Sequence, residues 1–365
     1  MKILFVYNVD WFFKSHRNLL ANELIKRKNE LFLISNNDKL NAFDKNDNIK
    51  FKKLRLSRGG IKLADLFTFF KLGFLIKRIN PNIIEFATIK PIIIGGLISK
   101  IFYKKTKKIY WLTGLGHLFT GNFENKFSFK IIRLIYSYIF NDTNSKIIFE
   151  NNEDRSLFIN LKITKPNQSY VIPGSFVDTS NFKFTIEPKE VSISFIGRIQ
   201  EDKGIKMYID AIRILRRKGY ENNFFAAGKL DDNPTAYTLN DIKKWEEENL
   251  IKYLGFKSEI KELFYNTNII CLPSKREGLP KVLVEAGASY RPSVVTNVPG
   301  CRNIIENGIN GIVLKENNSA ELANAIEYLI INKNKRIKLG NNAQKIVDEK
   351  FSSKVILKTL IKHFK

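Results

Sequence analysis

The feature that most constrains this chain is a regular alternation of short apolar, β-branched runs with longer amphipathic segments, in two series. In the first series we predict strands at residues 2–7, 31–35, 50–56, 83–86, 108–112 and 146–150, and helices at 17–27 and 61–79. In the second series we predict strands at 191–196, 223–227, 251–254, 269–272 and 293–296, and helices at 205–218, 239–248, 258–265, 280–289, 320–330, 333–349 and 352–364. Alternation of strands and helices of this length predicts parallel, doubly wound sheets.

A polar, interrupted stretch at residues 166–188 separates the two series. We therefore predict an α/β protein of two Rossmann-like domains that face each other across a cleft. The first domain is expected over residues 1–175 and the second over 176–350, and the helix in 351–365 is expected to pack back on the first domain.

Composition restricts the class of protein further. A hydrophobic content of 44% and a charged content of 27% are typical of a globular domain, whereas a net charge of +25 implies attraction to phosphorylated substrates, an anionic membrane or nucleic acid. Cys271 and Cys301 have no metal-ligand spacing, which favours a reducing compartment. The N-terminus resembles a strand more than a signal peptide, and no uncharged apolar run is long enough for a spanning helix, so we expect a cytoplasmic protein.

Two glutamates lie in and after the turn that follows the apolar run 269–272. Glu277 lies in the turn and Glu285 about two helical turns later, so both carboxylates can face one cleft. Gly278 exposes backbone N–H groups at a helix start, which favours a phosphate there. Two exposed glutamates beside an ordinary helix start are the alternative interpretation.

A second constellation follows the strand predicted at 191–196. Gly197 permits close approach of a ligand to the backbone, while Arg198 and Lys203 place two cations beside a helix start, a combination suited to a diphosphate. Solvated surface charge is the alternative. The loop at residues 8–16 lacks glycine, so the dinucleotide-binding fingerprint is absent from the first domain.

Together these motifs resemble the nucleotide-sugar half of retaining glycosyltransferases of family 4, which have the two-domain GT-B fold. The resemblance covers the second half of the chain through Gly197-Arg198, Lys203-Gly204, Ala227-Gly228, Tyr253-Leu254-Gly255-Phe256, Pro273-Ser274, Glu277-Gly278, Glu285-Ala286, Val298-Pro299-Gly300, Asn307-Gly308 and Asn310-Gly311. One departure is Asn303, where the family usually has a glutamate.

This resemblance implies a role for each position of the donor site. Arg198 and Lys203 would bind the diphosphate of a UDP-sugar, Glu285 the ribose, and Glu277 the hydroxyls of the donor sugar. Backbone N–H groups of Gly278 and Leu279 would contact the phosphate. The remaining positions expected to line the donor site, around the base, are Gly228, Tyr253, Leu254 and Phe256.

The first half resembles the bacterial subgroup that adds N-acetylhexosamines to undecaprenyl-diphosphate-linked sugars during O-antigen, capsule or N-glycan assembly. The matching stretches are Ser15-His16-Arg17, Thr88-Ile89-Lys90-Pro91 and residues 113–121. His16, Arg17, Lys90 and His117 are therefore expected to bind the acceptor diphosphate. For each histidine, a surface or capping role is the alternative, and His363 is expected to be exposed.

Three aromatic-rich, basic segments in the first half, residues 61–77, 98–108 and 127–140, are predicted as amphipathic helices. Such helices bind the anionic surface of a membrane, which fits a lipid-linked acceptor and predicts a peripheral protein on the inner face of the plasma membrane. Core helices with lysine rims are the alternative.

The resemblance implies retaining transfer by front-face attack, in which the leaving diphosphate accepts the proton of the acceptor hydroxyl. Glu277, His117, Arg198 and Lys203 form the predicted catalytic set. No Asp-x-Asp motif follows a strand, so no metal ion or other cofactor is expected. A hexose donor, a soluble acceptor or a UDP-sugar epimerase of the same fold remain alternatives. Nucleic-acid binding is disfavoured because no nucleic-acid module is recognisable.

Overall fold

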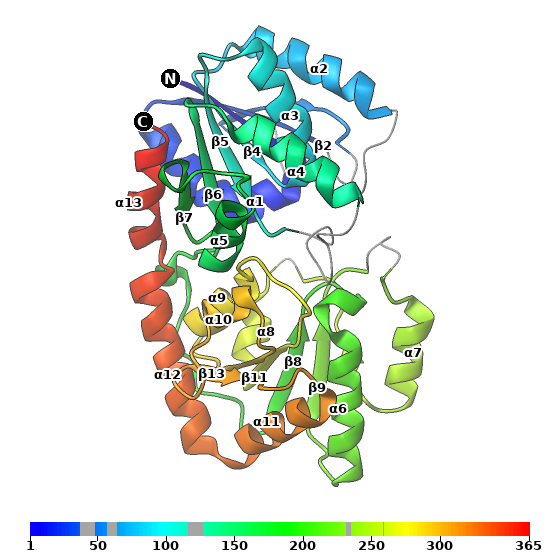
Figure 1. Ribbon diagram of the computed structural model, residues 1–365. Coiled ribbons are helices and arrows are strands. Elements are labelled where there is room, and N and C mark those ends of the chain that lie inside the picture. The colour runs from blue at the N-terminus through cyan, green and yellow to red at the C-terminus, as the bar shows by residue number, and fades with distance from the viewer. Residues whose placement is uncertain (37–47, 57–63, 116–126, 231–234, 258) are drawn as a thin grey trace. The chain divides into compact units, whose positions relative to one another are not determined.

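The computed structural model describes residues 1–36, 48–56, 64–115, 127–230, 235–257 and 259–365. The chain divides into two compact units, one formed by Met1–Gly174 with Ile356–Lys365 and the other by Ser175–Val355 (Figure 1). The break after Gly174 falls within the polar stretch at 166–188, and the last ten residues group with the first unit.

Parallel strands form the centre of the first unit. Among the described residues they are β1 (Lys2–Val9), β2 (Glu30–Asn36), β3 (Ile49–Lys53), β4 (Ile83–Ala87), β5 (Lys107–Leu112), β6 (Ser145–Phe149) and β7 (Ser169–Val171), in the order β3-β2-β1-β4-β5-β6-β7. All of the pairings are parallel. The order reverses between β1 and β4, as in a doubly wound fold, so the predicted fold class is confirmed.

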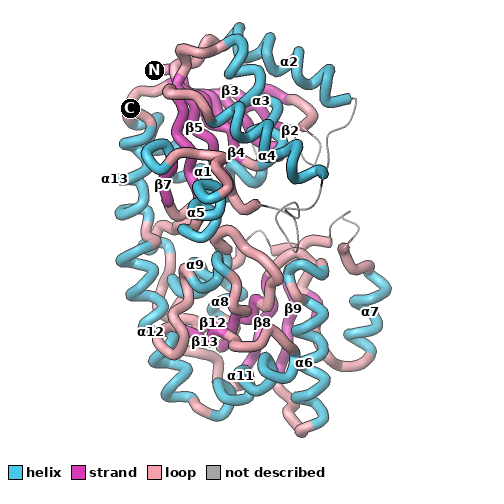
Figure 2. The backbone as a smooth tube through the Cα atoms, viewed as in Figure 1, coloured by secondary structure: helices cyan, strands magenta, loops and turns pink. Residues whose placement is uncertain are grey.

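Helices cover both faces of this sheet (Figure 2). They are α1 (Asp10–Lys26), α2 (Ala64–Ile79), α3 (Ile89–Phe102), α4 (Phe127–Phe140), α5 (Asn152–Asn160), the 3-10 turn η3 (Pro166–Gln168) and α13 (Ser353–His363). One hydrophobic cluster joins α2, α3 and α4 to side chains from five of the strands. Strands β1, β2 and β4 are buried along almost their whole length because helices pack on both sides of the sheet.

The second unit repeats the same architecture. Its described strands are β8 (Ser192–Ile196), β9 (Asn223–Ala227), β10 (Lys252–Tyr253), β11 (Ile269–Leu272), β12 (Ser293–Val295) and β13 (Gly311–Val313), all parallel and in the order β10-β9-β8-β11-β12-β13. The helices are α6 (Ile205–Arg217), α7 (Leu239–Glu247), α8 (Lys261–Tyr265), α9 (Lys281–Ala288), α10 (Pro299–Arg302), α11 (Ser319–Ile331) and α12 (Lys333–Lys350), with 3-10 turns η4 (Thr179–Asn181) and η5 (Glu201–Lys203).

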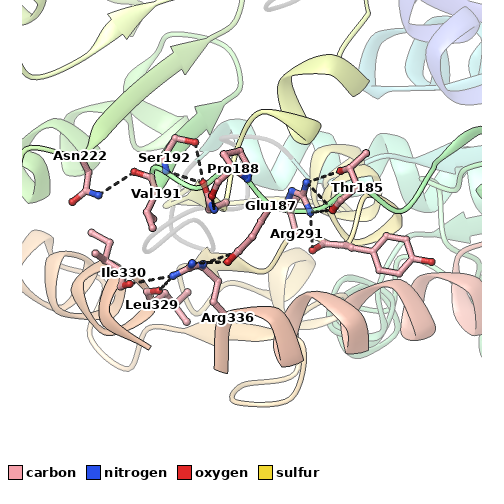
Figure 3. Close-up of polar contacts among 12 residues, drawn as sticks. Thr185, Glu187, Pro188, Val191, Ser192, Asn222, Arg291, Leu329, Ile330 and Arg336 are labelled. Atoms are coloured by element: carbon pink, nitrogen blue, oxygen red, sulfur yellow. Dashed lines mark hydrogen bonds and ion pairs between the residues drawn. The ribbon is translucent and has the colours of Figure 1, made fainter. Parts of the chain in front are cut away.

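Two buried arginines fix the segment that leads into β8 (Figure 3). Arg336 of α12 forms a bidentate ion pair with Glu187, at 2.7 and 2.9 Å, and also donates to the last carbonyls of α11. Arg291 donates to the hydroxyl of Thr185 at 2.7 Å. Burial opposes ionisation of Glu187, but the hydrogen bonds and charge of Arg336 outweigh it and lower the pKa of that carboxyl. These contacts order a stretch that the sequence suggested was only loop.

Several predicted boundaries were wrong. The loop expected at residues 8–16 is mostly helix, because α1 begins at Asp10 and its Phe13 packs edge-on against Phe5 and Tyr7. The helix expected at 98–108 ends at Phe102, and Lys107 already starts β5. The edge strands β7 and β13 are three residues each and carry too little pattern to be recognised from sequence. Among the described residues, no helix has the length and apolarity needed to cross a bilayer.

Candidate functional site

The candidate site lies at the carboxyl ends of β8 and β11 in the second unit. These parallel strands are neighbours at the point where the strand order reverses, with β9 and β10 on one side and β12 and β13 on the other. Gly197 and Arg198 follow β8, and Pro273 to Leu279 follow β11. Ligands of open α/β sheets bind at this position, so both sequence motifs reach the expected edge of one sheet.

Lys203 and Glu277 are in direct contact. The Nζ of Lys203 lies 2.6 Å from Oε1 of Glu277, and the same oxygen accepts a hydrogen bond of 2.7 Å from the hydroxyl of Ser274. The side chain of Glu277 is 7% exposed and that of Lys203 is 21% exposed. A cation predicted for the diphosphate and a carboxylate predicted for the sugar therefore belong to one cluster.

Close backbone approach holds the two loops of this cluster together. Gly204 has φ of 78°, and a Cβ added there would lie 1.9 Å from the carbonyl oxygen of Pro273. The backbone N–H of Lys275 donates to the carbonyl of Asp202 at 2.9 Å. Only glycine combines this φ with this contact, so the Lys203-Gly204 motif is explained by the packing of η5 against the loop after β11.

Gly228 plays a similar role on the other side of β8. A Cβ at Gly228 would lie 1.6 Å from the carbonyl oxygen of Gly197. The hydroxyl of Tyr253 donates to the carbonyl of Gly228 at 2.6 Å, and burial raises the pKa of this phenol, which therefore remains neutral. Leu254 is half-buried and its N–H donates to Ala226, whereas the side chain of Phe256 is 55% exposed. Among these positions predicted for the base, Phe256 offers the most open ring.

The turn after β11 leads into α9, which begins at Lys281 and carries Glu285. Glu285 pairs with Lys281 at 3.2 Å and is 16% exposed. Gly278 and Leu279 precede the helix, and Leu279 is buried with its carbonyl bound by the hydroxyl of Ser175 at 2.6 Å. A Cβ at Gly300 would lie 2.5 Å from the carbonyl oxygen of Gly278, so the Pro-Gly pair of α10 packs directly against the backbone of this turn.

Sequence reasoning assigned no role to two groups that support the site. Ser274 is fully buried, and its hydroxyl donates a hydrogen bond to Glu277. Its place next to Pro273, directly after a buried strand, was the sequence feature that could have indicated this role. Glu201 accepts hydrogen bonds from Lys275 at 2.6 Å and from the hydroxyl of Tyr237, and these bonds lower the pKa of Glu201. No sequence signal identifies this second group, because its members are far apart along the chain.

In the first unit, Arg17 does not occupy the place that was predicted for it. Its guanidinium is 1% exposed, lies 3.7 Å above the ring of Trp111, and pairs with Glu85 at 3.2 Å. Glu85 also accepts a hydrogen bond from the hydroxyl of Tyr7, and Arg17 donates to the carbonyl of Gly174 at 3.3 Å. A side chain with so little exposed surface supports the domain interior, so direct contact of Arg17 with an acceptor does not fit this placement.

The other residues predicted for the acceptor have different surroundings. Lys90 lies in the first turn of α3, and its ammonium is buried against Asp65 at 2.9 Å. His16 is half-buried in α1, where its ring stacks on Phe12 at 4.1 Å and its Nδ1 lies 3.1 Å from the carbonyl of Phe12. His117 lies outside the described residues. The structure thus gives Lys90 a carboxylate partner that the sequence did not reveal.

Comparison with known proteins identifies the family. Residues 176–346 match the family described as glycosyl transferases group 1, and residues 2–151 match that described as glycosyl transferase 4-like. The chain thus combines a glycosyl transferase 4-like domain with a glycosyl transferases group 1 domain. The two matches follow the two units of the structure, so the resemblance stated from the motifs is confirmed.

Two curated relatives cover nearly the whole of this glycosyltransferase. The N,N'-diacetylbacillosaminyl-diphospho-undecaprenol alpha-1,3-N-acetylgalactosaminyltransferase of Campylobacter jejuni is 26% identical over 341 residues, which are 89% of this chain and 88% of the relative. The capsular polysaccharide biosynthesis glycosyltransferase CapM of Staphylococcus aureus is 26% identical over 352 residues, or 93% and 90% of the two chains.

Solved structures confirm the GT-B fold of the glycosyltransferase. Sucrose-phosphate synthase from Thermosynechococcus elongatus superposes with a TM-score of 0.80 at 13% identity and covers 100% of this chain and 98% of its own. HepE of Anabaena in complex with UDP-glucose superposes with a TM-score of 0.78 at 19% identity and covers 100% and 99% of the two chains.

Proposed function

We propose that this glycosyltransferase moves an N-acetylhexosamine, GalNAc or GlcNAc, from a UDP-sugar to an undecaprenyl-diphosphate-linked saccharide, with retention at the anomeric carbon. The contact between Lys203 and Glu277 at the carboxyl edge of β8 and β11 carries the proposal. A nucleotide-sugar has an anionic diphosphate next to a sugar that carries hydroxyls. A cation beside a carboxylate matches these two groups.

The name of the C. jejuni relative supports an acceptor of this class, since that enzyme adds N-acetylgalactosamine to a sugar on diphospho-undecaprenol. A hexose donor is the second candidate, because a relative from Escherichia coli, 23% identical over 239 residues, is a UDP-Gal-dependent galactosyltransferase acting on a diphosphoundecaprenol-linked sugar. The lipid-linked acceptor favours a peripheral enzyme on the cytoplasmic face of the plasma membrane.

In the proposed reaction the acceptor hydroxyl attacks the anomeric carbon from the side of the leaving group. The bond from the anomeric carbon to the UDP oxygen breaks as the new glycosidic bond forms, and the leaving diphosphate takes the hydroxyl proton. Arg198 and Lys203 stabilise the charge that develops on the diphosphate, and Glu277 orients the sugar. Glu285 holds the ribose. No metal ion takes part in the proposed step.

Substitution of Glu285 by alanine tests the donor site. Glu285→Ala is expected to abolish transfer and to leave the circular dichroism spectrum and melting curve close to wild type. Glu327→Ala is the matched control, because Glu327 also pairs with a lysine on the surface of the second unit, Lys218. Retained turnover in Glu285→Ala, or equal loss in Glu327→Ala, would contradict the assignment.

The donor and the stereochemistry need a direct product analysis. Wild-type enzyme is incubated with a panel of UDP-sugars and a polyprenyl-diphosphate-linked acceptor, and the products are weighed by mass spectrometry. The mass increment separates an N-acetylhexosamine from a hexose, and proton NMR of the new linkage separates retention from inversion. Transfer only to a soluble sugar, or interconversion of the UDP-sugar without transfer, would identify a soluble-acceptor enzyme or an epimerase instead.

A further inference from the structure

Helices α2, α3 and α4 lie next to one another on one face of the first sheet (Figure 1). Small residues bring them close: a Cβ at Gly96 of α3 would lie 2.6 Å from Ile139 of α4, and the hydroxyl of Tyr103, just after α3, donates to the carbonyl of Gly73 in α2 at 2.9 Å. The outward faces of α2 and α4 therefore flank α3 and form one continuous surface.

This surface, which we call the three-helix face, is unusually apolar. Half of the exposed large hydrophobic residues that the structure describes belong to these three helices, although the helices form only a small part of the chain. They are Leu66, Phe67, Phe70 and Phe74 on α2, Ile101 and Phe102 at the end of α3, and Phe127, Ile131, Leu134 and Tyr138 on α4. Such a concentration marks an interaction surface rather than scattered exposure.

The pattern of α4 shows that its outer face is not an incidental rim of the core. One stripe of α4, through Phe129, Ile132 and Tyr136, is buried against the domain. The opposite stripe places Phe127, Ile131, Leu134 and Tyr138 at helical spacing on the outside, with Phe127 77% and Leu134 71% exposed. A helix that is apolar on both faces is normally covered on both, yet no described part of this chain covers the outer one.

The charge of the three-helix face indicates what kind of partner it binds. The three helices contain one acidic residue, Asp65, which is buried and paired with Lys90. Their exposed cations are Lys71, Lys77 and Arg78 on α2 and Lys130 and Arg133 on α4. A second copy would bring like charges together, whereas an anionic bilayer accepts both the cations at its headgroups and the apolar side chains below them.

We propose that the three-helix face inserts its aromatic side chains into the headgroup boundary of an anionic lipid bilayer. The inference rests on the proposed function in one respect: a lipid-linked acceptor lies in the membrane, so the enzyme must reach it there. Its physical basis is independent, because exposure and charge on α2 and α4 involve none of the donor-site residues. Binding therefore requires neither UDP-sugar nor acceptor.

The test is sedimentation of the full chain with extruded vesicles that contain no polyprenyl diphosphate. Vesicles of phosphatidylcholine with about one third phosphatidylglycerol are compared with pure phosphatidylcholine. The wild type is expected to sediment with the anionic vesicles. The triple variant Phe67→Ser/Phe70→Ser/Phe74→Ser is expected to lower the partition coefficient by on the order of 100-fold. These three side chains are 73%, 67% and 63% exposed, so the fold and melting temperature should be retained.

Two further variants make the comparison specific. Phe184→Ser/Ile186→Ser/Ile331→Ser removes side chains of the second unit that are 63%, 86% and 64% exposed, and it should bind like the wild type. Lys130→Gln/Arg133→Gln should lower binding to anionic vesicles by about 25-fold, at about fivefold per cation, and make the residual binding less sensitive to salt. A Phe70→Trp variant should show a blue-shifted emission that brominated lipids quench.

Failure of this inference is distinguishable from failure of the proposed function. Transfer to a short-chain, water-soluble polyprenyl-diphosphate acceptor should be the same in the wild type and in the triple Phe→Ser variant. The inference is overturned if that variant sediments like the wild type, if the control triple loses binding equally, or if the triple Phe→Ser substitution instead breaks a dimer seen by analytical ultracentrifugation.

Discussion

The Nζ of Lys203 lies 2.6 Å from Oε1 of Glu277, so the side chain predicted to bind the diphosphate and the one predicted to bind the sugar form an ion pair with each other. The ion pair is mostly shielded from water, since Glu277 is 7% and Lys203 21% exposed. Each partner keeps the other in the cluster and limits its rotamers. We infer that the diphosphate, on binding, shares Lys203 with Glu277 and that the carboxylate is already oriented for the sugar.

Lys203→Met is expected to lower kcat/KM for the UDP-sugar by about 100-fold to 1,000-fold, the range typical of removing one stabiliser of developing charge. The substitution also leaves Glu277 with Ser274 as the partner whose contact is described. Steady-state kinetics with varied UDP-sugar measures the effect. Lys203→Arg keeps the charge but not the compact ammonium, so it should recover only part of the rate.

The control for this prediction is Lys275→Met, because Lys275 pairs with Glu201 at 2.6 Å but is 56% exposed and has no predicted donor contact. It should retain most of the activity, since exposed ion pairs contribute little. If Lys203→Met and Lys275→Met lose activity equally, the special role of the Lys203–Glu277 pair is wrong.

Gly228→Ala is expected to be destabilising and nearly inactive. Its Cβ would lie 1.6 Å from the carbonyl oxygen of Gly197, and backbone cannot move aside as a flexible side chain can. The strand ends that hold Arg198 would have to separate. We expect a loss of about 2 to 4 kcal/mol in the free energy of unfolding, measured by urea denaturation.

Gly219→Ala provides the comparison, because Gly219 has φ of 86° but nothing within 4 Å of an added Cβ. It should cost only about 1 to 2 kcal/mol of backbone strain and leave activity intact. Equal destabilisation in the two variants would mean that close packing at Gly228 is unimportant.

Strand–helix alternation was enough to predict the fold, because a parallel strand buried on both faces is a run of apolar residues with no helical period. It failed where the local pattern is ambiguous. Residues 10–16 begin with Asp10 and three aromatics, a composition that also suits a loop, and only the packing of Phe13 against Phe5 and Tyr7 selects the helix. Tertiary contact overrode local preference there.

The proximity of Lys203 and Glu277 was predictable from sequence because they belong to two short motifs that follow neighbouring strands. Contacts between distant residues were not. Arg17 was predicted to bind the acceptor diphosphate because its partners, Glu85 and Trp111, are remote in sequence and lie on strands whose neighbouring residues are mostly apolar. Long-range pairing of a buried charge leaves no periodic signal in either segment.

Arg17→Met is expected to lower the free energy of unfolding by about 3 to 5 kcal/mol, because it leaves the fully buried carboxylate of Glu85 without its cation. Trp111 lies under the guanidinium, so its fluorescence should change in the native state as well. Chemical denaturation followed by tryptophan emission measures both effects. The matched control is Arg27→Met, whose ion pair with Glu23 at 2.9 Å is exposed and should be worth less than about 1 kcal/mol.

The outcome also separates two roles for Arg17. If the side chain contacts the acceptor, Arg17→Met should raise the acceptor KM without a loss of stability, and our placement of Arg17 in the interior would be wrong. If the side chain instead supports the domain interior, Arg17→Met should lower the free energy of unfolding. Arg17→Lys should then restore little, because an ammonium cannot cover the ring of Trp111 or reach Gly174 as the guanidinium does.

The environment of His363 is expected to make the stability of the protein depend on pH. The sequence suggested an exposed side chain, but His363 is half-buried at the end of α13, edge-to-face with Tyr170 at a centroid distance of 4.7 Å. Burial, aided by the charges of Lys146 and Lys362, lowers the pKa of this imidazole to about 4. In the unfolded chain the pKa is near its ordinary value of about 6.5.

The unfolded state therefore binds a proton on His363 between about pH 6.5 and pH 4, while the folded state does not, so this residue makes stability fall as the pH falls through that window. Partial exposure reduces the effect to about 1 to 2 kcal/mol at pH 4.5. His363→Phe keeps an aromatic ring against Tyr170 but cannot be protonated. Its melting temperature should equal that of the wild type at pH 8 and exceed it at pH 4.5, and parallel pH profiles for the two proteins would show that His363 is protonated equally in both states.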